Sequence, residues 1–285
     1  TGTQSQSISK EFDSAGLPAA FNYSLFVGGA LSLGCSTQVT GQTTGAIFGN
    51  GAISVGASAV VAGGPVQVAP GGSVSGPGTY TTGPPPSPLP TLPALNQTYY
   101  NTYINTATAG GPGVVIGNQS YVDLPVSGTL YVQGNVTLSG TTTGSGRIVA
   151  SGRISLATSA IVNSGIDLMA GSSISVGTSA IVNNSLAFSR TSVTLANSAR
   201  MTGTIVSAGT MTLNNSSVFT GAAYAAGSVI EHNSAIVVGS MVIGGSSVLH
   251  NSSTSTYSTA VLPASIPGIP GSGIYVPVAQ SWKKL

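Results

Sequence analysis

Hydrophobic residues recur along most of the chain in short alternating runs. Val193 and Leu195 lie two positions apart, as do Met211 and Leu213, with a small polar residue between them. A period of two predicts a β-strand with one buried side. Gly, Ser or Asn follows each run, so we expect many short strands.

The runs also repeat at a regular distance. Segments that begin at Gly209, Gly227 and Gly245 align without gaps at one constant spacing, and slightly longer spacings occur further upstream. So short a repeat leaves no room for a helix between parallel strands. We therefore predict an all-β fold, a roughly triangular parallel β-solenoid with about 18–22 residues per turn, in which aliphatic side chains stack from turn to turn.

Composition supports a packed interior. Only 4% of the 285 residues are charged, against roughly 25% in ordinary globular domains, and the net charge is +2. Disorder requires low hydrophobicity and high net charge, and this chain has neither. We expect Cys35 to be a small structural residue, and no apolar run is long enough to predict a membrane span. The abrupt start at Thr1 is what a processed or truncated chain would show.

One polar column is visible in the repeat. Four asparagines recur at the constant spacing of the repeat: Asn197, Asn215, Asn233 and Asn251. We expect a structural ladder of stacked amides at a corner of the coil, and the functional alternative is a metal-binding or ligand-binding row beside His232 and His250. Two histidines without a carboxylate cluster make a poor metal site, so no metal and no cofactor are predicted.

Glu231 does not fit the repeat. In strict register it occupies the interior column of Leu213 and Leu249, where an unpaired carboxylate would be costly. A one-residue bulge would point it outward. The alternative is a buried Glu231 paired with His232 or an arginine.

The chain divides into four parts. We predict solenoid turns at 26–75, an excursion outside the coil at 76–125, the main solenoid at 126–263, and a small capping sheet formed by 1–25 with 264–285. Turns before and after the excursion are expected to stack as one coil. Aromatic residues near both termini suggest that the termini meet at one end of it: Phe12, Phe21, Tyr23, Phe26, Tyr275 and Trp282.

The excursion contains a proline-rich stretch at 83–93 and a predicted helix at 96–108. The proline stretch either packs along the solenoid or binds a proline-recognition module. Asn96 is a suitable N-cap, and Tyr100 and Ile104 lie on one helical face with Tyr99 and Tyr103.

Four stretches together resemble the PilX-type pilus-assembly proteins, including ComZ-like minor pilins. They are the sequence from Phe26 to Leu33, the passage from the Pro-Leu-Pro-Thr-Leu-Pro run to Tyr103, the glycine-punctuated turns, and the ending Gln280 to Leu285. The resemblance implies a β-solenoid on a type IV pilin base, a cell-surface location on a pilus, and other pilin subunits as partners. Those contacts would use an N-terminal hydrophobic helix that is not in this sequence.

The leading hypothesis is the extracellular head of a minor tip pilin, which displays the solenoid for structural or adhesive contact with a surface polymer. A second is DNA capture for natural transformation, with phosphate contacts from Arg147, Arg153, Arg190 and Arg200. Arg147 and Arg153 fall on successive faces, which disfavours one stripe, and solvated or ladder-capping arginines are the alternative.

A third hypothesis is a self-assembling filament or surface-layer subunit, although the aromatic caps argue against it. We predict that the protein is not an enzyme. Asp123, Asp167 and Glu231 are too scattered to form the carboxylate pair that some β-helix hydrolases use.

Overall fold

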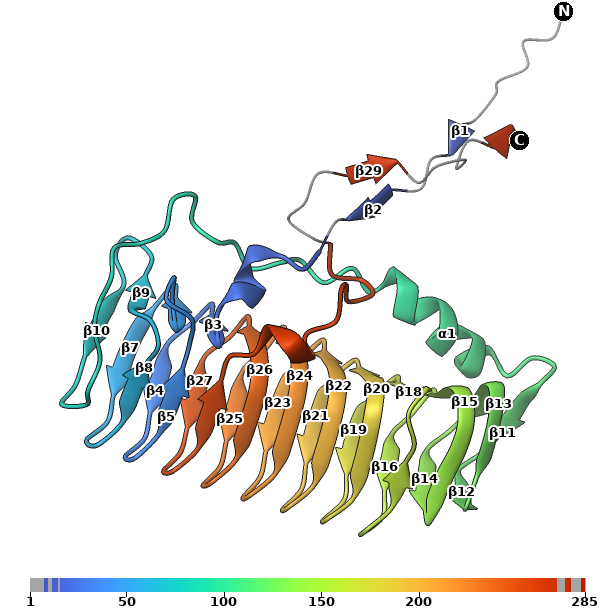
Figure 1. Ribbon diagram of the computed structural model, residues 1–285. Helices are drawn as coiled ribbons and strands as arrows, with labels where there is room; N and C mark the ends of the chain where they lie inside the picture. Colours follow the sequence, from blue (N-terminus) through green and yellow to red (C-terminus); the bar gives the residue numbers. More distant parts are fainter. Residues whose placement is uncertain (1–7, 10–11, 15, 271–274, 278–282, 285) are drawn as a thin grey trace, which may run out of the picture.

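The computed structural model describes residues 8–9, 12–14, 16–270, 275–277 and 283–284. Its central feature is the predicted parallel β-solenoid with one α-helix, α1 (Thr98–Ala109), along its side (Figure 1). Two short 3-10 helices, η1 (Ala19–Asn22) and η2 (Thr259–Val261), lie outside the coil. The fold class is therefore confirmed.

Two parallel sheets form the walls of the solenoid. The first sheet has eleven strands, in the spatial order β10 (Ser73–Ser75), β7 (Ala52–Val55), β4 (Leu31–Leu33), β27 (Ser247–Leu249), β25 (Val229–Glu231), β23 (Thr210–Leu213), β21 (Ser192–Leu195), β19 (Ser173–Val176), β16 (Ile154–Leu156), β14 (Val136–Ser139) and β12 (Gln119–Val122).

The second sheet has fifteen strands and bends to form the other two walls. Its main path is β11 (Val114–Ile116), β13 (Pro125–Gln133), β15 (Thr141–Ala150), β17 (Ile161–Val162), β20 (Ile181–Ser189), β22 (Arg200–Ser207), β24 (Val218–Ala225), β26 (Ile236–Ile243), β28 (Thr254–Thr256), β5 (Gln38–Thr40) and β8 (Val60–Ala62). The side members are β18 (Ile166–Ala170), β3 (Leu25–Val27), β6 (Ile47–Gly49) and β9 (Val66–Val68).

The bend in the second sheet depends on stacked glycines. Gly203, Gly221 and Gly239 pair in register and have φ angles of 116°, 141° and 133°. A Cβ added at Gly221 would lie 1.8 Å from the carbonyl oxygen of Gly203. Only glycine fits such a corner, which explains why glycine recurs at these three positions.

We name the three outer surfaces by their strands. Face one is the outside of the first sheet, face two is the outside of the second sheet before the glycine bend, and face three is the outside of the second sheet after the bend.

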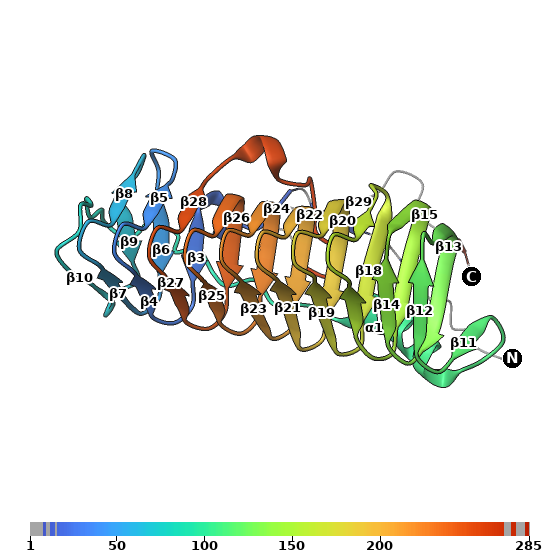
Figure 2. The same ribbon diagram turned by 90° about the horizontal axis from the view of Figure 1, so that it is seen from below.

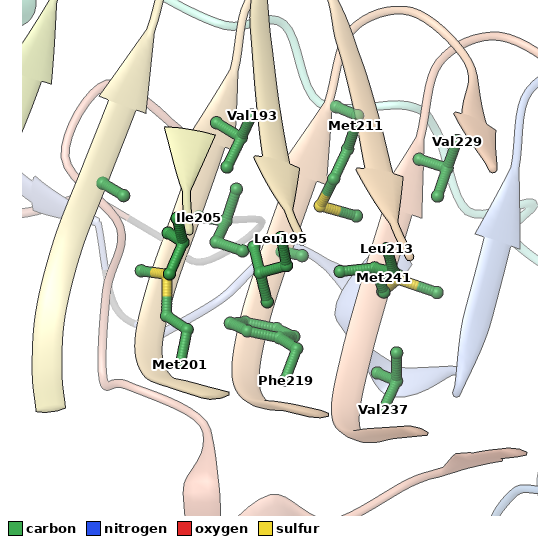
Figure 3. Packing of buried hydrophobic residues seen from close by; sticks show 14 of the residues in the cluster. Val193, Leu195, Met201, Ile205, Met211, Leu213, Phe219, Val229, Val237 and Met241 are labelled. Carbon is green, nitrogen blue, oxygen red and sulfur yellow. The ribbon is translucent and has the colours of Figure 1, made fainter. Parts of the chain in front are cut away.

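Within the coil, side chains stack in columns: Val193 lies next to Met211 and Met211 next to Val229, because their strands pair in register (Figure 3). At about 1.5–3 kcal/mol per large side chain, these columns supply most of the stabilisation.

The order of the turns differs from the order of the chain. The first turns stack on the last one, because β3, β4 and β5 pair in parallel with β26, β27 and β28. After β10 the chain runs back along face three through the proline-rich stretch and α1, and it re-enters the coil at the opposite end (Figure 1). The predicted continuous coil is present, although no pattern in the sequence indicated this junction. The excursion ends at Val114, earlier than predicted.

Helix α1 covers part of face three and closes a second apolar core. Tyr100 stacks on Phe188 at 3.7 Å between ring centroids, and Ile104 is fully buried. Thr98 N–H donates to Asn96 Oδ1, and Gly110 ends the helix with a φ of 68°. The predicted helix is confirmed, with its start two residues and its end one residue later than predicted. Beside it, the Tyr224 hydroxyl donates to the carbonyl of Pro93 and so holds the proline-rich stretch against the coil.

The termini pair in two short antiparallel ladders, β1 (Ile8–Ser9) with β30 (Lys283–Lys284) and β2 (Phe12–Ser14) with β29 (Tyr275–Pro277). We expected this sheet to cap one end of the coil. Figure 1 shows it apart from the coil, on the side that carries α1, and not at an end. Trp282 lies outside the described residues. At the β12 end, Ile116 and Val122 are 61% and 72% exposed.

Glu231 corrects a prediction. It pairs in strict register with Leu213 and Leu249, without a bulge, and is fully buried. Neither carboxyl oxygen has a hydrogen-bond partner among the described residues, so the predicted pairing with His232 or an arginine is also wrong. Burial raises the pKa of Glu231 from 4.5 to about 8, because the charged form is poorly solvated in the core.

Stability should therefore fall as pH rises from about 4.5 to about 8. In that range the folded chain retains a proton on Glu231 that the unfolded chain has released. The contribution is complete below the lower pKa and lost above the higher one. Replacing Glu231 by Leu or by Gln should remove this slope, on the order of 3 kcal/mol between pH 5 and pH 8.

The measurement is the free energy of unfolding as a function of pH. Glu231→Gln is the matched control, since it keeps the buried polar group but cannot ionise. Both variants should be flat in this window, and Glu231→Leu should also be the more stable of the two. A wild-type slope that persists in both variants would contradict the assignment.

Candidate functional site

Face one is the most regular surface of the protein. The register of the first sheet sets its central column, because an outward residue of each strand pairs with an outward residue of the neighbouring strand. In spatial order the column is Ser120, Thr137, Ser155, Ser175, Thr194, Thr212, Ile230, Val248, Ser32, Ser54 and Ser75. Hydroxyls occupy every position except the adjacent Ile230 and Val248, and neighbours are about 4.8 Å apart, the strand spacing.

Two outer columns flank the central one. The residues two positions before it are Asn118, Asn135, Arg153, Ser173, Ser192, Thr210, Ser228, Ser246, Ala30, Ala52 and Ser73. Those two positions after it, from β12 as far as β7, are Val122, Ser139, Ala157, Gly177, Ala196, Asn214, His232, His250, Gly34 and Gly56. Among these columns Arg153 is the one formally charged residue, so the face presents mostly small, neutral side chains. Figure 2 shows the strands that carry them in a straight row.

The corner beside face one repeats a strained backbone. Serines at this corner have φ angles of 56–61° in turn after turn: Ser159, Ser179, Ser198, Ser216, Ser234, Ser252, Ser36 and Ser58. Several of their N–H groups donate to the main-chain carbonyls of the next turn, among them Asn215, Asn233 and Asn251. The corner column thus exists, with serine rather than asparagine in the left-handed conformation. The amide ladder itself stays a prediction, although Asn251 Oδ1 accepts from the N–H of Cys35.

The other two faces are less open. Face three is covered by α1, η1 and the proline stretch. Face two is overlapped by η2, which forms a groove of about 470 Å³ with Thr202, Thr220 and Asn184. A second groove, of about 440 Å³, lies among the prolines between Pro18 and Pro93. Neither groove lies on face one.

Two of the predicted DNA-contacting arginines hold α1 instead. Arg190 donates from Nε and Nη2 to Asn101 Oδ1, at 3.1 and 2.7 Å, and from Nη2 to Asn105 Oδ1 at 3.0 Å. Arg147 donates to Tyr103 Oη at 3.0 Å, and its Nε lies 3.5 Å from Asp167 Oδ2. These guanidinium groups fasten the helix to the coil.

The remaining two arginines lie apart from each other. Arg153 is on face one and Arg200 is on face two, and both are exposed. The four predicted residues therefore occupy three faces and form no stripe that could follow a phosphate backbone.

The other candidate residues do not assemble into a reactive centre. No group of three His, Cys, Asp or Glu residues that could hold a metal is found in the described parts of the chain. Asp123 Oδ1 accepts from the N–H of Thr141, Asp167 Oδ1 accepts from the N–H of Leu186, and Glu231 is inside the core. The Cys35 side chain is exposed. Separately, none of the described helices is long and apolar enough to cross a membrane.

No family model and no curated protein match the chain. The similar solved structures include an ice-binding protein from an Antarctic biological consortium, with 14% identity, 89% of this chain and 96% of that chain covered, and a TM-score of 0.32. The DUF3494 domain of ice-binding protein 1 from Shewanella frigidimarina has 10% identity, coverages of 86% and 99%, and a TM-score of 0.27. A glycosylated ice-binding protein from an Arctic yeast has 16% identity, coverages of 86% and 94%, and a TM-score of 0.23. At such low TM-scores, the similarity does not by itself show what this chain binds.

The pilin interpretation is corrected by these findings. The solved structures reported above are ice-binding proteins and not pilins, and no pilin family model matches. These findings contradict the predicted PilX-type or ComZ-like identity, the tip-pilin head in adhesive contact with a surface polymer, the partnership with pilin subunits, the pilus location and the DNA-capture function. The expected filament or surface-layer role gains no support from them either.

The role of Arg190 can be tested by substitution. Arg190→Ala should lower the free energy of unfolding by about 1–3 kcal/mol, because it leaves two asparagine acceptors of α1 without their charged donor. It should also speed proteolysis between 84 and 113. Arg200→Ala, at an exposed arginine without such contacts, is the control, and equal effects in the two variants would rule out the anchoring role.

Proposed function

We propose that the protein binds ice through face one. The observation that carries this proposal is the central column of eleven in-register residues, nine of them serine or threonine. Groups that repeat at one strand spacing in one direction are suited to a ligand that is itself periodic. A crystal surface has that property and a single small molecule does not.

The chemistry of the face favours frozen water over an ionic solid. Hydroxyl groups both donate and accept hydrogen bonds, as water does, so a row of them can share a water lattice. Thr137, Thr194 and Thr212 also carry a methyl group, and methyl groups make no hydrogen bonds to liquid water. Charged side chains, which hold their own hydration shells, are nearly absent from the face. A mineral lattice would instead call for carboxylates or a basic cluster.

A crystalline polysaccharide is a second periodic ligand, but the face suits it less well. Sugar rings are commonly recognised by flat aromatic side chains that also carry hydrogen-bonding groups. No Phe, Tyr or Trp occupies the three outward columns of face one. Most of the buried aromatic residues belong instead to the second apolar core, against face three: Phe21, Tyr23, Phe26, Phe48, Tyr100, Phe188 and Tyr224. Binding to cellulose or chitin without binding to ice would overturn the proposal.

Ice binding also fits a role that needs no catalysis and no enclosed pocket. Such a protein works where ice forms first, so we propose that it acts outside the cytoplasm. The rigid coil supplies the needed flatness, because the side chains of face one are fixed to a continuous ladder of main-chain hydrogen bonds.

The test replaces one hydroxyl near the middle of the column by a large ring. Thr194→Tyr and Thr212→Tyr should each reduce thermal hysteresis and adsorption to ice at least several-fold, because a ring on a flat face holds the neighbouring groups away from the crystal. Stability should change by less than about 0.5 kcal/mol, since the substituted side chains point outward. The measurements are nanolitre osmometry and partitioning into a growing ice hemisphere.

Thr40→Tyr is the matched control, because Thr40 is an exposed strand residue of face two. It should leave ice adsorption unchanged. Equal losses in the control and the face-one variants would place the activity elsewhere, and a wild-type protein that neither shapes nor adsorbs to ice would refute the function.

A further inference from the structure

Two histidines stand side by side on face one. His232 and His250 follow β25 and β27 directly, one repeat apart, and their rings are stacked with centroids 5.2 Å apart and 6° between planes. They occupy adjacent positions in the third outward column, between Asn214 on one side and Gly34 on the other. The repeat therefore brings the protein's two imidazole groups onto neighbouring strands.

The backbone holds both residues while the rings stay accessible. His232 N–H donates to the carbonyl of Leu213 and His250 N–H to that of Glu231, at 2.8 and 2.7 Å. His250 is exposed and His232 is half-buried. Among the described residues neither ring takes part in a hydrogen bond, so the ring nitrogens are available to a ligand.

We propose that His232 and His250 form a site for a divalent transition-metal ion of the copper, nickel or zinc class. Imidazole nitrogen is a preferred ligand of these three ions. A metal–nitrogen bond is about 2.0–2.1 Å long, so two nitrogens on one ion lie no more than about 4 Å apart. The ring centroids are 5.2 Å apart and the rings are nearly parallel, so both side chains must rotate to turn one nitrogen of each toward a shared ion. No hydrogen bond among the described residues holds either ring in its present position.

The surroundings favour a cation weakly held by these two ligands and water. The adjacent outward residues are neutral: Ile230, Val248 and Asn214. Glu231 belongs to the same strand that leads into His232 but points into the core, so it is not a ligand. Two imidazoles leave the other coordination positions to water, which makes the ion exchangeable. Copper should bind most tightly, following the usual order of affinity for nitrogen ligands.

The test is isothermal titration of the metal-free protein with Cu²⁺, Ni²⁺ and Zn²⁺ in separate experiments. We expect one saturable site per chain. His232→Asn and His250→Asn should each weaken binding by at least about tenfold, the effect of losing one of two ligands. Asparagine keeps a polar side chain at these open positions, so thermal unfolding should be unchanged. Binding that survives in the double variant, or is absent from the wild type, would overturn the proposal.

A gain-of-function variant adds a second, independent readout. Asn214→His places a third imidazole in the same column, one strand beyond His232, and should tighten binding by at least about tenfold. Asn135→His, in the opposite outer column, is the matched control and should change nothing. Equal gains in both would indicate unspecific surface binding and refute the site. The titrations involve no ice, so their outcome is separate from that of the proposed function.

Discussion

The parallel hydrogen-bond ladder between successive turns is the constraint on which the structure depends. It places each residue directly above its counterpart one turn earlier, so every property of a single turn becomes a column. The apolar core, the glycine bend, the left-handed serines and the hydroxyl row of face one are four consequences of that register. A residue that departs from its column, such as Glu231 or Ile230, is still held in register by the strands on both sides.

Glu231 illustrates the strength of this constraint. A bulge would have brought its carboxyl group to water, but it would also have broken the register with β23 and β27 on both sides. The fold instead keeps the ladder intact and accepts a buried neutral carboxyl. Its raised pKa is thus the electrostatic cost of regular stacking.

Sequence reasoning predicted the coil, its triangular section and the helix, because these depend on local periods and on recurring spacings. It could not predict that the first turns join the last one, since contacts such as Ser24 with Ser255 leave no periodic trace. The candidate surface was missed for a related reason. Thr194 and Thr212 were visible as the polar half of an alternation, but which wall stays open depends on where the excursion packs. The four arginines were predicted to contact phosphate because of their charge, but Arg147 and Arg190 hold α1 against the coil.

The junction also determines where the molecule can grow. Because the first and last turns meet in the interior of the stack, between the third and fourth strands of the first sheet counted from β10, the two outer ends of the coil are formed by internal segments around β10 and β12. Duplication of one repeat unit within 126–263 would lengthen the open wall by one strand without displacing either terminus. Deletion of the last turn, β26 to β28, would instead remove the strands on which the first turns stack and so divide the solenoid into two shorter stacks.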